Sequence, residues 1–428
     1  MNPRERLVLK TGELLSPGFA ARAKVFGAGR AGRLERFNLL LSRARAALPA
    51  YDGACASALD GRPGLAALDE ISKLPVLGRA DVAGYAGGGA LARLESGGTS
   101  LSGRVETALD LNGVLLRYAG LLSVLGEAGW AMGRRTAALH PVEYGYFNNF
   151  GGLLRSGAYG KIVFEFFQQY VLYGLFHNRK NIYYDRGVFQ AEDAALDLLR
   201  RAAGGEPEFL IARPDVLGAG LAAARRGKLP PFRKLKAVLT VGTALGEEVR
   251  AAASEMLGAQ VYNMYASTEL GYVALGGPGC EGWLHVDEGD HLVETGPGNE
   301  LIVTDLNNRV TPMLRYATGD VAWLERRRCP CGREGLMLKP RGRKGKFLET
   351  AAGGRLYEAE AASLAFASGL PLFQFSAGKN EVRLALNGKP APGAAAITAA
   401  LGLPEGRCVL LPGANFEIPA SGKFSFII

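Results

Sequence analysis

The sequence contains little cysteine and no long apolar run. Five cysteines among 428 residues do not make the dense framework of a disulfide-stabilised secreted domain. No stretch of about 18 uncharged apolar residues is present, which argues against a transmembrane helix. Residues 1–10 carry charges and lack a long apolar stretch, so we expect no secretory signal. These features predict a soluble cytoplasmic protein with no membrane partner.

Blocks of one charge are also missing, although the net charge is +9. The densest basic run, residues 340–346, is interrupted by glycines, and no signature of DNA or RNA binding is present. We therefore expect no nucleic-acid partner. The positive excess fits a solvated surface around a site for an anionic small substrate.

The chain is long enough for two or three domains and a large core. An apolar stripe predicts a helix over residues 33–48. A strand at 235–241, a helix at 247–257 and a strand at 260–265 alternate in the manner of an α/β sheet.

The later part of the chain is richer in turns. Strands are expected at 299–305 and 321–325, and a linker at 341–346. We predict an α/β fold with two domains: residues 1–344, with layered sheets and a β-rich subdomain, and residues 345–428, a small mobile α+β lid.

Four motifs carry residue types suited to nucleotide chemistry. The Gly- and hydroxyl-rich loop 96–104 can wrap a phosphate chain, or it is an ordinary surface loop. Residues 262–269 combine an aromatic ring, a hydroxyl and a carboxylate, or they form a capped strand end. A carboxylate after a glycine in 314–320 suits a ribose, although Gly-Asp turns are common. Residues 418–423 place a lysine on a tight turn near the C-terminus. The alternative is that this lysine is only a solvated surface charge.

In their order and spacing, these motifs resemble those of the acyl-adenylate-forming (AMP-binding) enzyme superfamily. The resemblance covers roughly residues 70–428, and residues 242–245 match its adenine-binding turn. Leu-Pro-Val-Leu at 74–77 and Cys-Pro-Cys-Gly-Arg at 329–333 resemble the phenylacetate–CoA ligase-like branch. The chain departs from the superfamily at Ala266, where a glycine is usual, at Arg104, where a lysine is usual, and at the hinge, which lacks an acidic pair.

The resemblance implies ATP, Mg²⁺ and coenzyme A as ligands. It implies catalytic roles for Lys423, Glu269 and Thr268, with Glu269 also holding Mg²⁺. The implied nucleotide-binding residues are Ser96, Thr99, Ser100, Gly242, Thr243, Ala244, Asn263, Tyr265, Thr268, Asp320 and Arg343.

The implied enzyme is an AMP-forming acid–thiol ligase, a type of acyl-CoA synthetase. Its partners would be a small carboxylic acid, ATP and coenzyme A, and the protein could form a homodimer. A carrier-protein thiol or an amine is the alternative acceptor, and a nucleotide-binding homologue without catalysis is the alternative from another class.

Aromatic residues at 144–150 suggest a pocket for a flat aromatic acid, because the superfamily places its acyl-pocket wall there. Plain core packing is the alternative. The proposed pocket residues are Tyr144, Tyr146, Phe147, Phe150 and Ala266.

Three cysteines and one histidine form a candidate zinc set. Cys280 and His285 are five residues apart, and Cys329 and Cys331 flank one proline. Three Cys and one His make a closed structural zinc site, and thiols in a reducing compartment favour metal over disulfide. Free buried thiols are the alternative, and His291 is a weaker candidate for the fourth ligand.

Overall fold

The structure is a computed structural model in which the chain divides into two compact units, each described here by itself. The residues that it describes are 2–83, 88–95, 105–142, 154–155, 162, 166–190, 193–369, 373–376, 381–384, 393–404, 409–412, 416–419 and 422–428. Unit 1 comprises residues 1–127, 264–275 and 283–339, and unit 2 comprises residues 128–263, 276–282 and 340–428. The domain boundary expected at 344/345 lies inside unit 2 and stays a prediction.

Unit 1 begins with helices whose ends follow from local sequence. In α1 the side chain of Asn2 accepts the Glu5 N–H, and a proline stands in the first turn, where its missing N–H costs nothing. The stripe expected over 33–48 is buried on one face of α3. The helices of this unit are α1 (Pro3–Leu15), α2 (Phe19–Lys24), α3 (Arg33–Ala47), α4 (Pro49–Ala58), η1 (Leu68–Lys73), α5 (Arg79–Val82) and α6 (Leu111–Glu127).

The strands of unit 1 lie in the order β10-β11-β12-β13-β9-β8, and the pairs β10–β11, β11–β12, β13–β9 and β8–β9 are antiparallel. Their bounds are β8 (Gly271–Gly276), β9 (Leu284–Val286), β10 (His291–Thr295), β11 (Glu300–Asp305), β12 (Tyr316–Arg328) and β13 (Glu334–Arg343). A separate antiparallel pair is formed by β1 (Ala92–Glu95) and β2 (Glu106–Leu109). One apolar core joins strands β8 to β13 to α3 and α4.

Two boundaries differ from the sequence-based expectation. Strand β12 extends over Tyr316–Arg328, well beyond 321–325, because its pairing with β11 shifts register and so accommodates Gly319, where a turn was expected. The first half of the expected linker 341–346 belongs to β13, and the Arg341 guanidinium donates to Glu360 at 2.6 Å.

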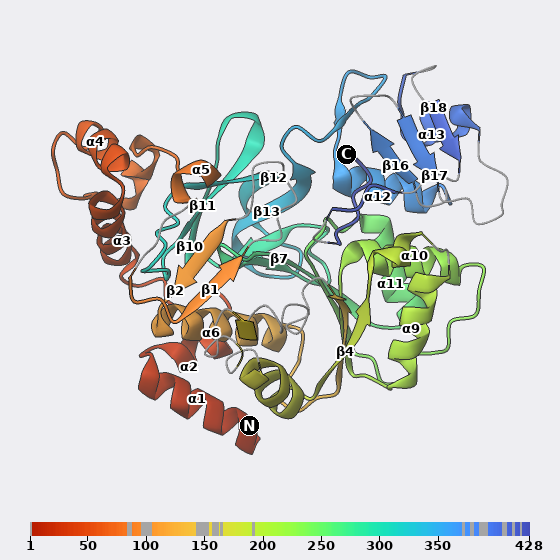
Figure 1. Cartoon of the computed structure of the whole chain (residues 1–428), viewed down its shortest axis with the longest axis horizontal. Coiled ribbons are helices and arrows are strands. Elements are labelled where there is room, and N and C mark those ends of the chain that lie inside the picture. Colours follow the sequence, from red (N-terminus) through yellow and green to blue (C-terminus); the bar gives the residue numbers. More distant parts are fainter. Residues whose placement is uncertain are drawn as a thin grey trace. The chain divides into compact units, whose positions relative to one another are not determined.

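Unit 2 contains parallel strands in the order β4-β3-β5-β6, followed by β7. Their bounds are β3 (Thr136–Pro141), β4 (Arg179–Tyr184), β5 (Phe209–Ala212), β6 (Ala237–Val241) and β7 (Gln260–Ser267), the last of which ends in unit 1. The helices α9 (Ala194–Gly204), α10 (Pro214–Ala224) and α11 (Glu247–Leu257) lie together beside these strands (Figure 1). Two shorter elements, η3 (Phe167–Phe176) and η4 (Arg186–Phe189), complete this part. The alternation confirms the expected α/β class.

The C-terminal part of unit 2 has a small core of its own. It is built from β14 (Leu348–Glu349), β15 (Arg355–Leu356), α12 (Glu358–Ala367), β16 (Phe373–Ser376), β17 (Glu381–Leu384), α13 (Ala394–Ala400) and β18 (Val409–Pro412). Strand β17 pairs antiparallel with β16 and parallel with β18, so this part is α+β as expected.

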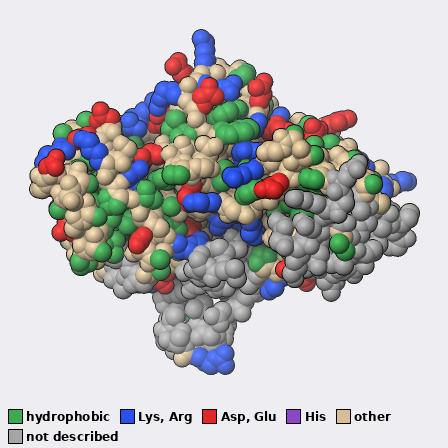
Figure 2. All heavy atoms as spheres, turned by 90° about the horizontal axis from the view of Figure 1, so that it is seen from above, with side chains coloured by type: hydrophobic (Ala, Val, Ile, Leu, Met, Phe, Trp, Pro, Cys, Tyr) green, Lys and Arg blue, Asp and Glu red, His purple; other side chains and the backbone are tan. Residues whose placement is uncertain are grey.

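Charged side chains of both signs are scattered over the described part of the face in Figure 2. Among the described helices, none combines the length and the apolar character needed to cross a membrane.

Candidate functional site

In unit 1, Tyr265 and Asp320 meet although 55 positions separate them. The Tyr265 hydroxyl at the end of β7 donates to Asp320 Oδ2 at 2.6 Å. Asp320 lies in the irregular part of β12, where Gly319 has a φ of +74° that favours glycine. The Asp320 N–H donates to Thr318 Oγ1 at 3.1 Å, which orients the carboxylate-bearing turn. A ring and a carboxylate predicted to serve one nucleotide are thus brought together.

The Thr268–Glu269 turn follows β7, and a buried arginine holds its backbone. Arg117 of α6 donates to the carbonyl oxygens of Thr268 and Glu269, at 2.5 Å each. The same guanidinium lies 3.5 Å from Asp305 Oδ2, and burial lowers the pKa of Arg117 despite that carboxylate. Because both backbone carbonyls are fixed, the Thr268 and Glu269 side chains emerge from a defined backbone.

Glu269 itself is nearly buried and faces a cation. Its carboxylate lies 3.6 Å from the Arg79 guanidinium, with side-chain exposures of 7% and 16%. Arg79 begins α5, one residue after the Leu-Pro-Val-Leu segment, and Leu77 bridges to Tyr316 of β12. The chain segment at 74–79 is therefore tied to both the 262–269 and 314–320 motifs.

In unit 2, the expected adenine turn follows β6. Gly242 has a φ of +102°, a conformation that an L side chain adopts only with strain. Thr243 Oγ1 accepts the Asp215 N–H at 3.3 Å, and Ala244 completes the turn. Asn263 accepts a hydrogen bond from the Thr240 hydroxyl at 3.0 Å, which connects the ends of β6 and β7.

Lys423 is half-buried in a segment packed against the same unit. The carbonyl of Gly422 accepts from Arg213 at 2.8 Å, and the N–H of Phe424 donates to Asp215 at 3.0 Å. Arg343 is half-buried at the end of β13.

For the remaining predicted site residues, no contacts are described. Ala266 is half-buried in β7. The others lie outside the described residues: Ser96, Thr99, Ser100, Tyr144, Tyr146, Phe147 and Phe150.

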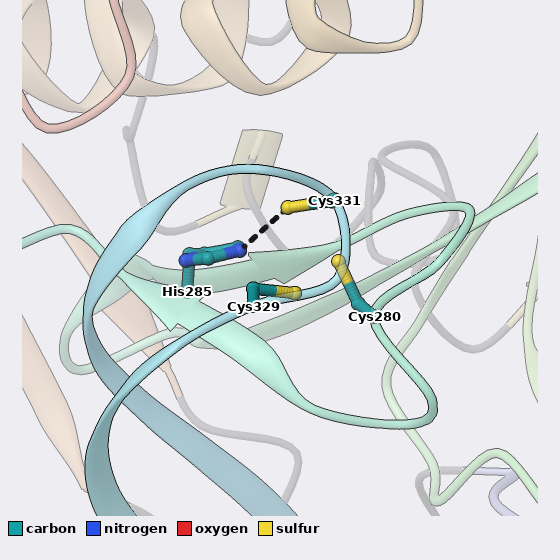
Figure 3. A group of neighbouring side chains, drawn as sticks. All are labelled: Cys280, His285, Cys329 and Cys331. Atoms are coloured by element: carbon teal, nitrogen blue, oxygen red, sulfur yellow. Dashed lines mark hydrogen bonds between the residues drawn. The ribbon is translucent and has the colours of Figure 1, made fainter.

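The predicted zinc residues converge, as Figure 3 shows. One ligand atom from each of Cys280, His285, Cys329 and Cys331 lies within 4.8 Å of the others. His285 Nε2 is 3.2 Å from Cys331 Sγ. Burial, aided by the positive charge of Arg333, lowers the pKa of His285 to about 4, so its imidazole is neutral at pH 7, as a metal ligand must be.

The donor set and its setting fit a zinc ion. Cys280 lies in the loop between β8 and β9, His285 in β9, and the other two cysteines in the turn between β12 and β13. Three sulfurs and one imidazole nitrogen at this spacing can close into a tetrahedron. The weaker candidate His291 belongs elsewhere, because its Nε2 lies 2.9 Å from the carbonyl of Leu270.

Comparisons with known proteins identify the fold. No family model and no curated protein matches the sequence. The structure resembles 2-hydroxyisobutyryl-CoA ligase in the postadenylation state in complex with R3-HIB-AMP, with a TM-score of 0.63 and 17% identity over 93% of this chain and 89% of that one. The chain has the acyl-adenylate-forming fold.

Other states of that ligase match this chain as well. An open conformation with 2-HIB-AMP and CoA gives a TM-score of 0.54 at 17% identity, over 90% of this chain and 88% of that one. The thioesterification state, also with 2-HIB-AMP and CoA, gives 0.53 at 17% identity, over 93% and 89%.

Sequence reasoning missed four residues that hold the motifs of this chain in place. Arg79 and Arg117 lie in helices that are far in sequence from the motifs that they contact. Arg213 stands just before α10, and Asp215 lies in its first turn. The Arg-Pro-Asp sequence at 213–215 offered a weak signal, because it marks a helix start with two charges beside it. The other two had no local signal.

Proposed function

We propose that this chain is an AMP-forming acid–thiol ligase, which activates a carboxylic acid with ATP and transfers the acyl group to coenzyme A. The observation that carries the proposal is the Tyr265–Asp320 hydrogen bond in a chain with the adenylate-forming fold. A ring beside a carboxylate, followed by the hydroxyl and carboxylate of Thr268 and Glu269, suits the base, ribose and phosphates of one nucleotide.

The first step joins the acid to AMP. A carboxylate oxygen bonds to the α-phosphorus of ATP, and the bond from that phosphorus to pyrophosphate breaks. Because two anions meet, catalysis consists mainly of positioning and charge neutralisation. We assign Lys423 to the oxygens that gain charge, Thr268 to the α-phosphate and Asp320 to the ribose.

The remaining nucleotide contacts follow the motifs. Loop hydroxyls of Ser96, Thr99 and Ser100 are assigned to the β- and γ-phosphates, and Arg343 to the ribose or phosphates. We assign Glu269 to a Mg²⁺ ion, because Mg²⁺ takes one or two carboxylates with phosphates and water. The Arg79 guanidinium, 3.6 Å away, would share that carboxylate with the ion. The bound ion would neutralise phosphate charge.

In the second step the thiol sulfur bonds to the activated carbonyl carbon, the bond to AMP breaks, and the thiol proton passes to solvent. Rotation of residues 345–428 would exchange the catalytic faces between the steps. We propose an aromatic acid as the substrate, on the basis of the aromatic residues at 144–150 and the resemblance to phenylacetate–CoA ligases.

We further propose a structural role for Zn²⁺ at the four-residue cluster. Four protein ligands leave no open position for substrate, as in structural rather than catalytic zinc sites. The ion would cross-link the β8–β9 and β12–β13 turns of the sheet.

The proposed function is tested by trapping acyl-adenylate with hydroxylamine over a panel of acids. The panel pairs phenylacetate and benzoate with 2-hydroxyisobutyrate, the acid named for the similar ligase. Acid-dependent hydroxamate and pyrophosphate establish adenylation, and thioester formation with coenzyme A establishes the acceptor. Adenylation of 2-hydroxyisobutyrate alone would contradict the aromatic substrate. Transfer only to a carrier protein or an amine would contradict coenzyme A, and ATP binding without pyrophosphate release would contradict an enzyme.

A further inference from the structure

A buried ion pair lies where β5 ends and α10 begins. Arg213 Nε donates to Asp215 Oδ1 at 3.1 Å, and Arg213 Nη2 donates to Asp215 Oδ2. The two side chains are only 7% and 3% exposed. Removing one member of a buried ion pair strongly destabilises the fold, whereas the intact pair contributes little net stability. Net stability therefore does not account for this pair, which points to a specific role.

The pair holds the backbone on both sides of Lys423. Arg213 Nη2 donates to the Gly422 carbonyl at 2.8 Å, and Asp215 Oδ2 accepts the Phe424 N–H at 3.0 Å. Gly422 has a φ of +64°, a left-handed conformation that glycine adopts without strain. The lysine is thus centred between two charge-assisted hydrogen bonds made by one ion pair.

An aromatic anchor reinforces this attachment. The Phe424 ring is 2% exposed and belongs to the apolar core around strands β3 to β6. Its centroid lies 5.0 Å from that of Phe189 and 5.1 Å from that of Phe416. Burial of so large an apolar ring stabilises the attachment. The residue after the lysine is therefore fixed by both its backbone and its side chain.

The same ion pair touches the expected adenine turn. The Asp215 N–H donates to Thr243 Oγ1 at 3.3 Å. A Cβ on Gly242 would lie 3.6 Å from Arg213 Cγ, which shows how closely the arginine passes the turn. Residues 213 and 215 thus connect the Gly242–Thr243 turn with the segment that carries Lys423.

Two other side chains, one buried and one half-buried, hold the segment from within residues 345–428. Gln374 donates to the carbonyls of Glu417 and Ser425, and Glu358 accepts the N–H groups of Phe426 and Ile427. These bonds can persist when residues 345–428 move together. The bonds to Arg213 and Asp215 link that part to the strands and helices before residue 344, so such a movement has to break them.

We propose that Arg213 and Asp215 are positioning residues that latch Lys423 in place for acyl-adenylate formation and release it for the thiol step. This inference rests on the proposed function. It assigns the lysine's placement to residues outside the motifs that carry the catalytic groups.

The test compares Asp215→Asn, Lys423→Ala and the double variant in single-turnover reactions. We expect Asp215→Asn to slow acyl-adenylate formation about tenfold or more, since misplacement by about 1 Å can cost about 10²-fold. Asp215 acts through Lys423, so the double variant should be no slower than Lys423→Ala. Thioester formation from synthetic acyl-adenylate should keep its wild-type rate in Asp215→Asn. The matched control is Asp197→Asn, which alters an exposed Arg–Asp pair on α9.

Equal slowing of both half-reactions by Asp215→Asn, additive losses in the double variant, or a normal adenylation rate would each overturn the latch. Phe424→Ala is the second variant, because it weakens the attachment without leaving a buried charge unpaired, and it should show the same selective loss.

Hydrogen exchange at the Phe424 amide provides a readout independent of activity. Exchange should accelerate at least tenfold in Asp215→Asn relative to Asp197→Asn. If no acid supports pyrophosphate release in the wild type while this exchange accelerates, the proposed function fails and the attachment stands. If the wild type is active and the exchange is unchanged, the latch fails alone.

Discussion

The two units hold their motif residues in different ways. In unit 1 the Tyr265 and Asp320 side chains bind each other directly, and the buried Arg117 fixes two consecutive carbonyls of the Thr268–Glu269 turn. In unit 2 the backbone on either side of Lys423 is held by an ion pair, through two contacts that each span 209 positions of the chain. The first arrangement fixes side chains and a turn within unit 1, whereas the second holds a segment by its backbone, and under the proposed latch that segment would be released as a whole.

This difference predicts that the two groups of residues serve different parts of the reaction. Groups that contact the nucleotide throughout are best built on rigid strands and helices. A lysine needed in one half-reaction is better carried on a segment that can move together with the part of the chain that bears it. The variants below test this division, starting with the largest expected effect.

Lys423→Ala should slow acyl-adenylate formation by about 10²-fold or more, because its ammonium neutralises charge that develops in the transition state. ATP binding should change little. Thioester formation from synthetic acyl-adenylate should continue, because the proposed mechanism assigns that step to the other lid orientation. Single-turnover rates of the two half-reactions measure this, with the exposed Lys180→Ala as control. Equal losses in both half-reactions, or none in either, would remove the distinction between the units.

Glu269→Gln should reduce adenylation by about 10²-fold, the scale of losing one electrostatic contact at a reacting group. The carboxylate is lost while the Arg117 contacts to the backbone of the turn remain, so the fold should be kept. Acid-dependent pyrophosphate exchange at a range of Mg²⁺ concentrations measures the effect, and Glu255→Gln on the exposed side of α11 is the control. Exchange within about threefold of wild type, well below that scale, would show that Glu269 is not a metal-binding residue.

The same division explains what could be predicted from sequence. Residues 262–269 carry their chemistry locally, so the strand before the Thr268–Glu269 turn could be inferred, whereas β12 was expected to begin only at 321. The nucleotide expected at these motifs stays a prediction. The convergence of Cys280, His285, Cys329 and Cys331 was also predictable, because few other pairings of thiols and imidazoles were available. Arg79 and Arg117 could not be found, because an arginine that supports a distant turn has no pattern that separates it from a surface arginine, and the Arg-Pro-Asp sequence at 213–215 signalled only a helix start. Their roles depend on tertiary contacts.

Zinc removal should lower stability while sparing the chemistry of the nucleotide site. The purified protein should hold about one Zn²⁺ per chain, and Cys331→Ser should lose it and lower Tm by about 5 °C or more, the shift expected for 2 kcal/mol in a unit of this size. Metal analysis and thermal unfolding measure these quantities. Cys55→Ser makes the same change at a buried cysteine outside the cluster and should retain the metal. Zinc-free protein from a purification without chelator would contradict the site.

The smallest expected effect concerns Glu358, which holds the lysine segment from the side of residues 345–428. Its Oε1 accepts the Phe426 N–H at 2.6 Å, and its Oε2 lies 2.9 Å from Ser425 Oγ. Burial is the main cause that raises the pKa of Glu358 from 4.5 to about 7, against the hydrogen bonds from the segment. The Ser425 hydroxyl has one proton and is also 2.7 Å from the Ile427 carbonyl, so a protonated Glu358 can donate to Ser425 while Ser425 donates to Ile427.

The sign of the pH dependence follows from this raised pKa. Between about pH 4.5 and 7 the folded state binds the Glu358 proton more tightly than the unfolded chain, so the contribution of Glu358 to stability is complete below pH 4.5 and lost as the pH rises to 7. Glu358→Gln cannot ionise, so the Tm of the wild type relative to this variant should fall between pH 5 and pH 8. Glu255→Gln controls for the change in net charge. A Tm difference that stays constant over this range would mean that Glu358 is ionised throughout, and that the attachment of the lysine segment from this side does not respond to pH.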